Sequence, residues 1–548
     1  MPGLLTYWHT LRHLKPIQLY GRIWFRLARP RVDMRQAPPL RSTHRRAWVK
    51  PAARRVSLVG PGRFCFLNDT HDLAACGWDD PALEKLWRYN LHYFDDLNAQ
   101  DADARAEWHQ ALLLRWVRDN PPTGGTGWEP YPTSLRIVNW IKWALGAHAL
   151  PPECVESLAV QTRWLSQHLE IHLLGNHLFA NAKALVFAGV YFDGPEAEGW
   201  LEKGLRILNR EVREQVLPDG GHLERSPMYH ALALEDMLDL INLAATSSET
   251  MLGRWRRFAD SWLETVGRMR VWLAAMCHPD GEISFFNDAA IGIAPSPMEL
   301  EAYAGRLGLP SVPVAGDGVA HFHESGYIRV QRGNMVALLD VAPVGPDYLP
   351  GHAHADTLSF ELSLFGRRVL VNSGTSRYGV GPERLRQRGT AAHNTVTIDG
   401  QDSSEVWGGF RVARRAKPFG LQIQEDANGV HVVCSHDGYE RLPGRPIHRR
   451  EWRLSDHAVE IVDTVDGKFG EALGRLFFSP ALMAPLSTSA EAGHGVAAEG
   501  RALNWRVEGA AARVVAATYH PEFGVTEPNH CLEMGLTGPR CVVRFTWD

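Results

Sequence analysis

The chain has 548 residues, which suits two or three domains, and its formal net charge is −4 at pH 7. Hydrophobic residues make up 45% and charged residues 22%, as in an ordinary globular protein, and no apolar run is long enough to span a bilayer. The small net charge excludes an overall attraction to nucleic acid, so we expect no nucleic-acid partner.

Residues 1–30 mix aromatic and aliphatic side chains, among them Trp8 and Trp24, with interspersed arginines. These charges break any continuous hydrophobic stretch, so the segment lacks the form of a secretory signal, and we expect a cytoplasmic or inner-membrane-associated protein. Two interpretations stay open. The segment is either an amphipathic helical lead-in docked on the body, or a helix on a membrane surface, which would give a peripheral membrane association. We assign residues 1–75 to this lead-in and its extension.

From residue 76 to residue 318 the hydrophobic pattern is helical. Successive segments place apolar residues three to four positions apart, and breakers rich in Pro and Gly separate them. Helices are expected at 81–96, 104–119, 134–150, 156–174, 177–191, 197–217, 228–245 and 252–277. Successive helices with short connections indicate an array or toroid of helical hairpins. No repeat of fixed period is visible, which argues against a regular solenoid.

Polar clusters interrupt this helical part at 175–177, at 219–230 and at 285–288. The first stands at the head of a predicted helix, where Asn is a favoured cap. The second contains Tyr229 close to a predicted helix start, and the third contains Asp288 in a loop. Each has a structural explanation: a cap, a core tyrosine with a satisfied hydroxyl, and a second cap. So many titratable groups within 219–230 nevertheless favour a functional site.

From residue 319 to residue 548 the apolar pattern alternates with a period of two. Strands are expected at 326–331, 335–341, 358–364, 368–371, 394–398, 430–434, 451–454, 459–465 and 542–547. Asp-Gly turns separate several of them, and many short strands at such spacing predict an antiparallel β-sandwich. The predicted fold class is therefore α+β and multidomain, helices first and strands second, with a cleft between them.

The most polar segment of the strand-rich part is 351–356, directly before the predicted strand at 358–364. If the strand began early enough, His352, His354 and Asp356 would all point to one face of the sheet. Imidazoles and a carboxylate are costly to bury without partners. The segment therefore indicates a site that either performs chemistry or holds a metal.

Histidines and a third polar residue from separate predicted strands are compatible with a metal site. His354, Asn372 and His393 could together bind a first-row metal ion. Buried histidines that bond to one another are the alternative. The seven cysteines are scattered without CxxC pairs, which argues against a cysteine-based zinc site.

Together these motifs resemble the heparinase II/III-like polysaccharide lyases. The segments that carry the resemblance are Gly175–Asn181, Glu224–His230, Gly351–Phe360, Asn372–Thr375 and His393–Thr395. The resemblance covers most of the chain, and it is strongest to a branch associated with exopolysaccharide or capsule production. It implies an incomplete (α/α) toroid followed by an antiparallel β-sandwich, and it makes a periplasmic location an alternative.

The resemblance also implies a reaction, the β-elimination of a uronic-acid-containing polysaccharide to give unsaturated uronate ends. Asn176 and His177 match the positions that neutralise the substrate carboxylate. Tyr229 matches the general acid, which for some substrates is also the base, and His352 matches the base or partner acid. We expect Tyr229 and His352 to meet across the domain interface, and an arrangement on opposite faces of the sugar would suit either uronate epimer.

Further residues are expected around these four. Those expected to contact substrate are Arg136, Glu224, His230, Asn287, Arg388, Trp407 and Arg411. The resemblance implies a structural zinc ion on His354, His393 and Asn372, where Asn372 replaces an Asp common in the family. Asp356 is a substitute ligand, and a site without metal is the alternative. No organic cofactor is expected.

Two other functions stay open, a non-catalytic glycan-binding protein of an exopolysaccharide assembly system and a glycan hydrolase. The set of Asn176, His177, Tyr229 and His352 favours the lyase, because a binding protein needs no proton-transfer pair. A hydrolase needs paired carboxylates in its cleft, which only a pair such as Glu224 and Asp288 would supply.

Overall fold

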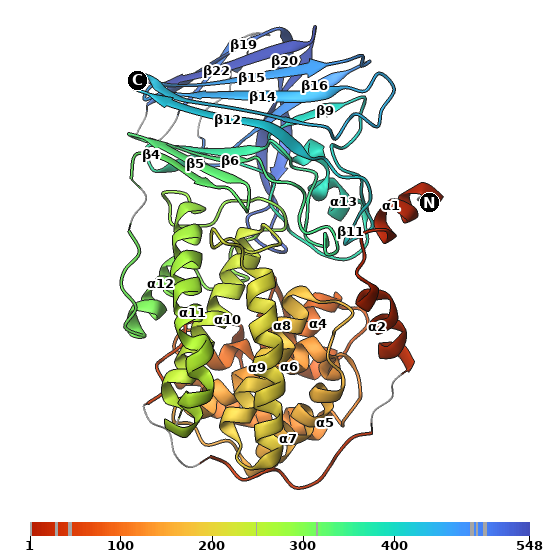
Figure 1. Ribbon diagram of the computed structural model, residues 1–548, viewed down its shortest axis with the longest axis vertical. Helices are drawn as coiled ribbons and strands as arrows, with labels where there is room; N and C mark the ends of the chain where they lie inside the picture. The colour runs from red at the N-terminus through yellow and green to blue at the C-terminus, as the bar shows by residue number, and fades with distance from the viewer. Residues whose placement is uncertain are drawn as a thin grey trace.

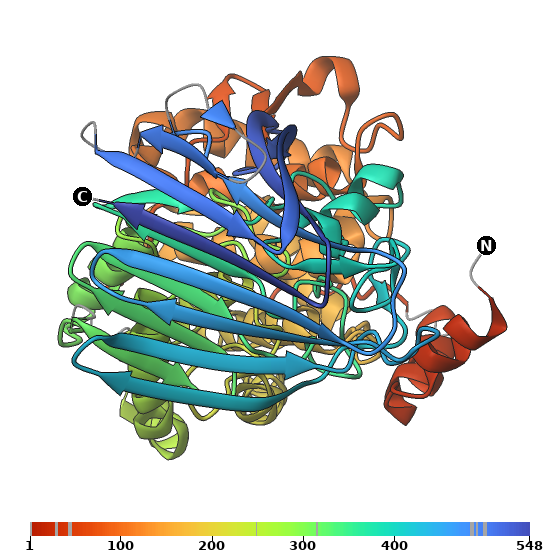
Figure 2. The ribbon, with the colours of Figure 1, turned by 90° about the horizontal axis from the view of Figure 1, so that it is seen from above.

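The computed structural model describes residues 3–27, 31–41, 47–247, 249–313, 316–482, 487–488, 492–496 and 501–547. A helical body and a body of two sheets lie one above the other along the long axis (Figure 1). The first two helices lie at one side, near the level where the two bodies meet (Figures 1 and 2). No helix within the described ranges has the length and apolar character to cross a membrane.

The helices are α1 (Leu4–Leu11), α2 (Pro16–Leu27), α3 (Leu73–Cys76), α4 (Lys85–Tyr93), α5 (Ala106–Asp119), α6 (Pro130–Leu145), α7 (Pro152–Gln167), α8 (Gly175–Tyr191), α9 (Pro195–Gln215), α10 (Pro227–Thr246), α11 (Glu249–Ala275), α12 (Pro297–Arg306) and α13 (Pro382–Arg388). Each segment predicted to be helical overlaps one of the helices α4 to α11. Helices α6 and α7 begin earlier than predicted, at Pro130 and Pro152, because proline is favoured in the first turn.

Helix α8 lies at the centre of the helical body. Almost all of its side chains are buried, which fits a helix surrounded by others. Helix α9 packs against it at close range, and two glycines permit the approach. A Cβ on Gly189 would lie 2.6 Å from the backbone nitrogen of Leu201, and one on Gly204 would lie 2.8 Å from the carbonyl oxygen of Ala182. This packing holds α8 closely against α9.

The strands are β1 (Leu58–Gly60), β2 (Arg63–Phe66), β3 (Asp69–Asp72), β4 (Gly318–Phe322), β5 (Tyr327–Arg332), β6 (Met335–Asp340), β7 (Phe360–Leu364), β8 (Arg367–Leu370), β9 (Val396–Ile398), β10 (Val406–Trp407), β11 (Arg411–Val412), β12 (Pro418–Asp426), β13 (Gly429–His436), β14 (Ile447–Leu454), β15 (Ala458–Asp466), β16 (Ala472–Phe478), β17 (Ser487–Thr488), β18 (Ala492–Val496), β19 (Ala502–Glu508), β20 (Ala510–Tyr519), β21 (Glu527–Leu536) and β22 (Arg540–Trp547). Strands β1 to β3 form a small sheet within the predicted extension.

Two large antiparallel sheets make up the second body. One has the order β12-β13-β14-β15-β22-β19-β18-β17, and the other has the order β20-β21-β16-β8-β7-β6-β5-β4, with β9 beside β16. Their facing sides share one apolar core, which includes Phe360, Trp452, Phe478 and Trp505. Two sheets packed over a common core form a β-sandwich.

The segment 351–356 is not part of a strand. Strand β7 begins only at Phe360, and Leu358 has a φ of 64°, which an extended strand does not allow. His352, His354 and Asp356 therefore lie in a loop, so the condition under which they would share one face of a sheet does not hold. The loop is free to turn each side chain in its own direction.

Helices α1 and α2 contact both bodies through polar groups. The indole of Trp407 donates to the hydroxyl of Thr10 at 3.1 Å, and the Gln18 amide donates to the carbonyl oxygen of Tyr348 at 3.0 Å. Lys15 forms an ion pair with Glu214 of α9. Residues 1, 2 and 28–30 of the predicted lead-in are outside the described residues.

Candidate active site

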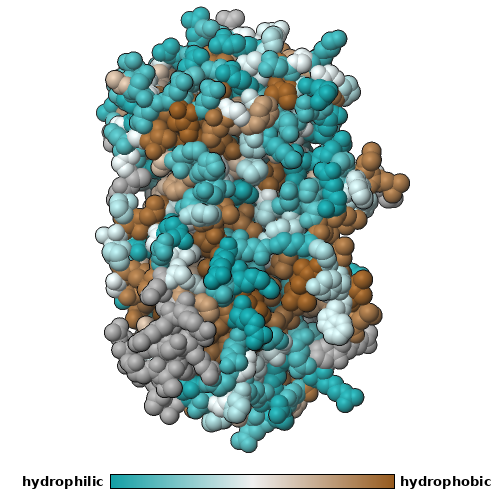
Figure 3. All heavy atoms as spheres, in the orientation of Figure 1, coloured by the Kyte–Doolittle hydropathy of each residue, from teal (hydrophilic) through white to brown (hydrophobic). Residues whose placement is uncertain are grey.

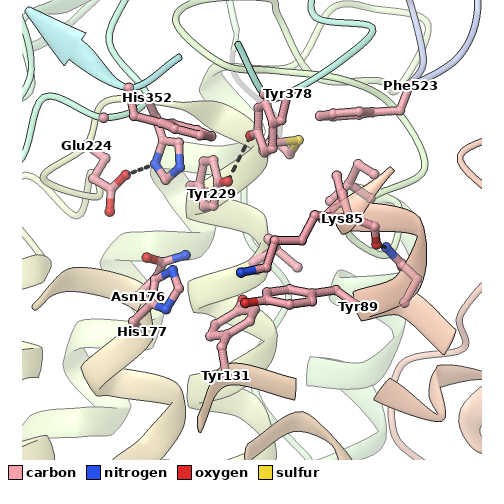
Figure 4. A pocket seen from close by; sticks show the side chains of 18 of the residues that line it. Lys85, Tyr89, Tyr131, Asn176, His177, Glu224, Tyr229, His352, Tyr378 and Phe523 are labelled. Atoms are coloured by element: carbon pink, nitrogen blue, oxygen red, sulfur yellow. Dashed lines mark hydrogen bonds and ion pairs between the residues drawn. The ribbon is translucent and has the colours of Figure 1, made fainter. Parts of the chain in front are cut away.

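A cavity of about 850 Å³ opens where the helical body, the sandwich loops and the N-terminal helices meet. Helices α1, α2, α4, α6, α8 and α10 line it, together with the loops at 347–352 and 377–380. Its volume lies in the range of ligand-binding clefts. Figure 4 shows side chains from both bodies turned into this space.

Tyr229 reaches the cavity from the first turn of α10. Pro227 starts the helix, and the Ser226 hydroxyl accepts a hydrogen bond from the backbone nitrogen of Tyr229 at 3.2 Å. The Tyr229 hydroxyl lies 2.8 Å from the hydroxyl of Tyr378. Burial, and then the neighbouring Tyr378 and Asp288, raise the pKa of Tyr229 well above its ordinary value. The phenol therefore keeps its proton at neutral pH, as a general acid must.

His352 stands beside Tyr229 and is held by a carboxylate. The two rings are stacked with centroids 3.8 Å apart, and Nδ1 of His352 forms a short hydrogen bond with Glu224. Burial raises the pKa of Glu224, but the hydrogen-bonded His352 beside it outweighs burial and leaves that pKa lowered. An ionised Glu224 only accepts hydrogen bonds, so Nδ1 carries the proton. The lone pair of His352 is then on Nε2, as a general base requires.

Asn176 and His177 occupy the first turn of α8, so Asn176 is not the helix cap, a position that Leu174 takes. Gly175 has a φ of 54°, and a Cβ there would lie 2.4 Å from a side-chain carbon of Leu349. Glycine thus allows the helix end to approach the sandwich loop. The end of α8 presents the positive pole of the helix dipole and free backbone N–H groups to the cavity.

His177 is biased toward its charged form. Its Nδ1 lies 3.1 Å from a carboxylate oxygen of Glu170, and the Asn181 amide holds the other oxygen at 3.1 Å. Burial lowers the pKa of His177, but the Glu170 carboxylate outweighs it and raises that pKa. Within the described residues, the Asn176 amide has no hydrogen-bond partner. This helix end is therefore built to receive an anionic group.

The structure brings all four predicted catalytic residues to one cavity (Figure 4). It does not place Tyr229 and His352 on opposite faces of a sugar, because ring centroids 3.8 Å apart leave no room for a sugar ring between them. The two side chains do meet between the two bodies, as expected. Both side chains approach the cavity from the same wall.

His354, two residues beyond His352, is sealed in the interior. Its Nε2 lies 2.8 Å from Asp288, and its Nδ1 lies 3.2 Å from Nε2 of His393. Asp288 also forms a buried ion pair with Arg384. Burial lowers the pKa of His354, and burial also lowers the pKa of His393. This set, Asp288 with His354, His393 and Arg384, is called the sealed cluster below.

A zinc ion beside the sealed cluster would need donors that are free to turn toward it. Both ring nitrogens of His354 are already bonded, and the Asn372 amide oxygen accepts a hydrogen bond from the backbone nitrogen of Asn394 at 3.1 Å. Within the described ranges, no group of three or more His, Cys, Asp or Glu side chains is placed to hold a metal. The donors as arranged do not fit the predicted zinc ion, which stays a prediction of the resemblance.

Two residues expected to contact substrate lie in the core of the helical body. Arg136 is fully buried, stacks on Trp116 at 3.8 Å and donates to Gln161 at 2.9 Å. His230 is also fully buried, with its Nε2 2.9 Å from the carbonyl oxygen of Met269. Neither borders the cavity. The expectation is wrong for both, because each lies on the inward side of its helix.

Three further expectations of substrate contact fail because the side chains hold loops in place. The Asn287 amide oxygen accepts from the backbone nitrogen of His354 at 3.0 Å, and Arg388 donates to the carbonyl oxygen of Ala353 at 2.7 Å. Trp407 packs against α1 and donates to a threonine of that helix at 3.1 Å. None of Asn287, Arg388 and Trp407 borders the cavity.

Of the remaining expected contacts, Arg411 and Glu224 do border the cavity, and Glu224 holds His352 there. Other residues of the cavity wall were not predicted from the sequence. These are Lys85, Tyr89, Tyr131, Tyr378 and Phe523 (Figure 4). Tyr378 follows the predicted strand at 368–371 in a segment with Ser, Arg and Gly, and such a polar turn bearing an aromatic side chain was the available signal.

Two family models match the chain. The model for the heparinase II/III N-terminus matches residues 92–299, and the model described as heparinase II/III-like, C-terminal, matches residues 315–546. The chain belongs to the heparinase II/III-like family. A crystal structure of heparinase III is similar with a TM-score of 0.66 and 18% identity, covering 84% of this chain and 76% of that chain. This likeness confirms the predicted fold class.

Individual relatives carry different names. A heparin-sulfate lyase of Bacteroides stercoris is 29% identical over 381 residues, which is 64% of this chain and 53% of that protein. The chain thus spans about half the length of this relative. FtsZ-localized protein C of Caulobacter vibrioides is 25% identical over 387 residues, which is 67% of this chain and 62% of that protein.

Proposed function

We propose that the protein is a polysaccharide lyase that cleaves a uronate-containing acidic polysaccharide by β-elimination. The observation that carries the proposal is the shared cavity of Tyr229, His352, Asn176 and His177. The heparin-sulfate lyase among the relatives supports the same class of reaction. The hydrolase alternative is less well supported, because Asp288 is sealed in an ion pair and does not border the cavity.

The first task of such an enzyme is to neutralise the substrate carboxylate. The C5 hydrogen next to a charged carboxylate is very weakly acidic, and the intermediate places further charge on that group. The Asn176 amide, the His177 imidazolium and the end of α8 would bind the carboxylate. Donors fixed before the reaction are effective because they need no rearrangement as the charge develops.

The second task is proton transfer. In the proposed step, Nε2 of His352 takes the C5 proton, and the C5–H electrons form the C4=C5 double bond. The C4–O bond breaks with its electron pair on oxygen, and this oxygen takes the proton of Tyr229. Glu224 stabilises the imidazolium that forms on His352, and the Tyr378 hydroxyl stabilises the phenolate left on Tyr229.

Because the acid and the base lie on one wall of the cavity, one of the two uronate epimers is favoured as substrate. Removing the proton and protonating the leaving oxygen from one side is a syn elimination. In glucuronate the C5 hydrogen and the C4 oxygen lie on the same face of the ring, whereas in iduronate they lie on opposite faces. We therefore propose glucuronate at the cleavage site, because Tyr229 and His352 are stacked.

Two arginines supply a place for further acidic groups of the polymer. Arg22 of α2 and Arg411 of β11 both border the cavity. Within the described residues, neither side chain has a hydrogen bond or an ion pair. They lie close enough for Arg22, after burial, to lower the pKa of Arg411. Guanidinium groups without carboxylate partners fit sulfate or carboxylate groups of a polysaccharide.

The test is a panel of glucuronate-rich and iduronate-rich polymers, followed by the far-UV absorbance of unsaturated uronate ends. We expect absorbance to rise with glucuronate-rich polymers and to rise far less with iduronate-rich ones. New reducing ends without this absorbance would indicate hydrolysis and contradict the proposal. Binding of the polymers without any product would favour a glycan-binding protein instead.

A further inference from the structure

The N-terminal helices expose their apolar faces. The exposed large apolar side chains of α1 and α2 are Leu4, Leu5, Tyr7, Trp8, Leu11, Leu19, Tyr20, Ile23, Trp24 and Leu27. Along α2 they recur every three to four residues, which defines one stripe of an amphipathic helix. In a helix that packs on a globular body this stripe faces the core. Here it faces outward, and Trp8 and Trp24 are 63% and 65% exposed.

The inner faces of the same helices are polar and tightly docked. Thr10 and Gln18 are the buried positions that bond to the sandwich loops, as described above. At Gly21 a Cβ would lie 3.2 Å from the Cβ of His172, so α2 approaches the helical body closely there. The orientation of α2 is therefore set by its polar face, and among the described residues its apolar stripe has no partner.

We infer that the outer faces of α1 and α2 dock the protein onto the surface of an anionic lipid bilayer. Apolar patches of this kind mark an interaction surface. The kind of partner is inferred from the charge and the residue composition of the two helices. Residues 3–27 carry no Asp or Glu, and Arg12 and Arg26 are exposed. The other two basic residues are engaged elsewhere, Lys15 with Glu214 and Arg22 at the cavity. Basic residues beside Trp, Tyr and Leu on short helices are typical of segments that lie in the headgroup region of a membrane.

Figure 3 shows apolar side chains on the flank where Figure 1 places α1 and α2. The same helices form part of the cavity wall through Thr10, Gln18 and Arg22. Docking of their outer faces would hold the cavity next to the bilayer. One consequence, which rests on the proposed lyase function, is that the substrate is an acidic polymer present at the membrane surface. The docking itself is independent of catalysis.

The inference is tested with the full chain and sedimented vesicles. One set contains phosphatidylglycerol and phosphatidylcholine in equal parts, and the other contains phosphatidylcholine alone. We expect the protein to sediment with the anionic vesicles, and to do so less at higher salt, because salt screens the basic residues. Binding that is absent, or equal for both kinds of vesicle, would overturn the anionic bilayer as the partner.

The variant Ile23→Asp with Trp24→Asp charges the outer stripe without touching a buried contact. We expect it to lower vesicle binding at least about tenfold, because two apolar anchors are lost. The matched control is Met298→Asp on α12, which is 79% exposed and distant in the chain. The control should bind as the parent does. Equal binding of parent and double variant would contradict the assigned surface.

Two further measurements distinguish membrane docking from dimer formation and from catalysis. Light scattering reports the oligomeric state, and a dimer that the double variant dissociates, without vesicle binding, would assign the stripe to a second copy and overturn the membrane. Turnover of soluble polymer should be the same in parent, double variant and control, because the outer stripe does not border the cavity. If the protein cleaved none of the polymers, the proposed lyase function would fail, but the vesicle result would still test membrane docking.

Discussion

His352 and His354 lie in one loop, each beside a carboxylate, yet their surroundings differ completely. His352 faces the cavity with Nδ1 on Glu224, and within the described residues its Nε2 has no partner. His354 is sealed, with both ring nitrogens bonded. The comparison teaches that a histidine–carboxylate pair becomes a candidate for chemistry only when one nitrogen stays free and reachable.

The sealed cluster also holds the open site in place. The backbone nitrogen of Asp288 donates to the carbonyl oxygen of His352 at 2.9 Å, and the backbone carbonyl of Asp288 accepts from the Ser226 hydroxyl. Ser226 caps the helix that carries Tyr229. One buried residue thus ties together the two segments that supply the proposed base and acid.

A second cluster of the same composition lies within the sandwich, away from the cavity. His448 bonds His436 at 3.1 Å and Asp463 at 2.8 Å, and Arg450 bonds Asp463 at 2.7 Å. None of these four residues borders the cavity. The recurrence supports a structural role for a buried carboxylate shared by a histidine and an arginine, and separates that role from the chemistry assigned to His352.

The largest effect is expected for the open site. Tyr229→Phe and His352→Ala should each lower kcat by about 10²- to 10⁴-fold, because each removes one proton-transfer group. Initial rates of unsaturated uronate formation measure this, and thermal unfolding serves as the control for folding. A rate within about twofold of the parent in either variant would contradict the assignment of acid and base.

A substitution in the sealed cluster should lower the stability of the fold. Asp288→Ala leaves the Arg384 guanidinium buried without its partner, which should lower the free energy of unfolding by about 3–5 kcal/mol. Urea denaturation measures the change. The matched control is Glu440→Ala, which removes an exposed ion pair with Arg445 and should cost about 0–1 kcal/mol. Equal costs for the two variants would show that the sealed cluster does not hold the fold.

His177 should make substrate affinity depend on pH. Its folded pKa is raised above the ordinary 6.5, so its charge and the stability it contributes are complete below 6.5 and are lost as pH rises through the folded pKa. We expect KM to rise over the same interval, because the substrate carboxylate loses a cationic partner. In His177→Gln this part of the pH profile should disappear. An unchanged profile would assign the titration to another group.

The smallest effect is expected from chelation. Both ring nitrogens of His354 are bonded within the sealed cluster, so treatment with a chelator should leave the melting temperature and the turnover unchanged. Elemental analysis of the purified protein provides the direct check. Stoichiometric zinc, together with a fall in melting temperature after chelation, would show instead that His354, His393 and Asn372 rearrange around a metal.

Hydrophobic periodicity was sufficient to predict the two bodies of the fold. It located α4 to α11 and strands such as β7 and β15, because each presents a regular apolar face to a core. It did not predict that the apolar stripe of α2 faces outward. Periodicity shows that a helix has an apolar face, but it does not show where that face points. Strand ends were also missed where a residue such as Leu358 adopts a positive φ.

The candidate site was predicted in part, and the division has a physical reason. Asn176, His177, Tyr229 and His352 were predicted because their motifs match a family pattern. The assigned contacts at Arg136, His230, Asn287, Arg388 and Trp407 failed because a polar residue near a motif can equally serve a core or a loop. Only the packing of both bodies decides between these roles, as it also decides between His352 and His354.

The central claim is that the stacked pair of Tyr229 and His352 performs β-elimination. The most direct measurement is an NMR analysis of the products formed from a defined glucuronate oligosaccharide by the parent protein and by Tyr229→Phe. We predict a C4=C5 double bond at the new non-reducing end with the parent and unreacted substrate with the variant. A saturated uronate at that end, or the same double bond at the same rate with the variant, would contradict the account.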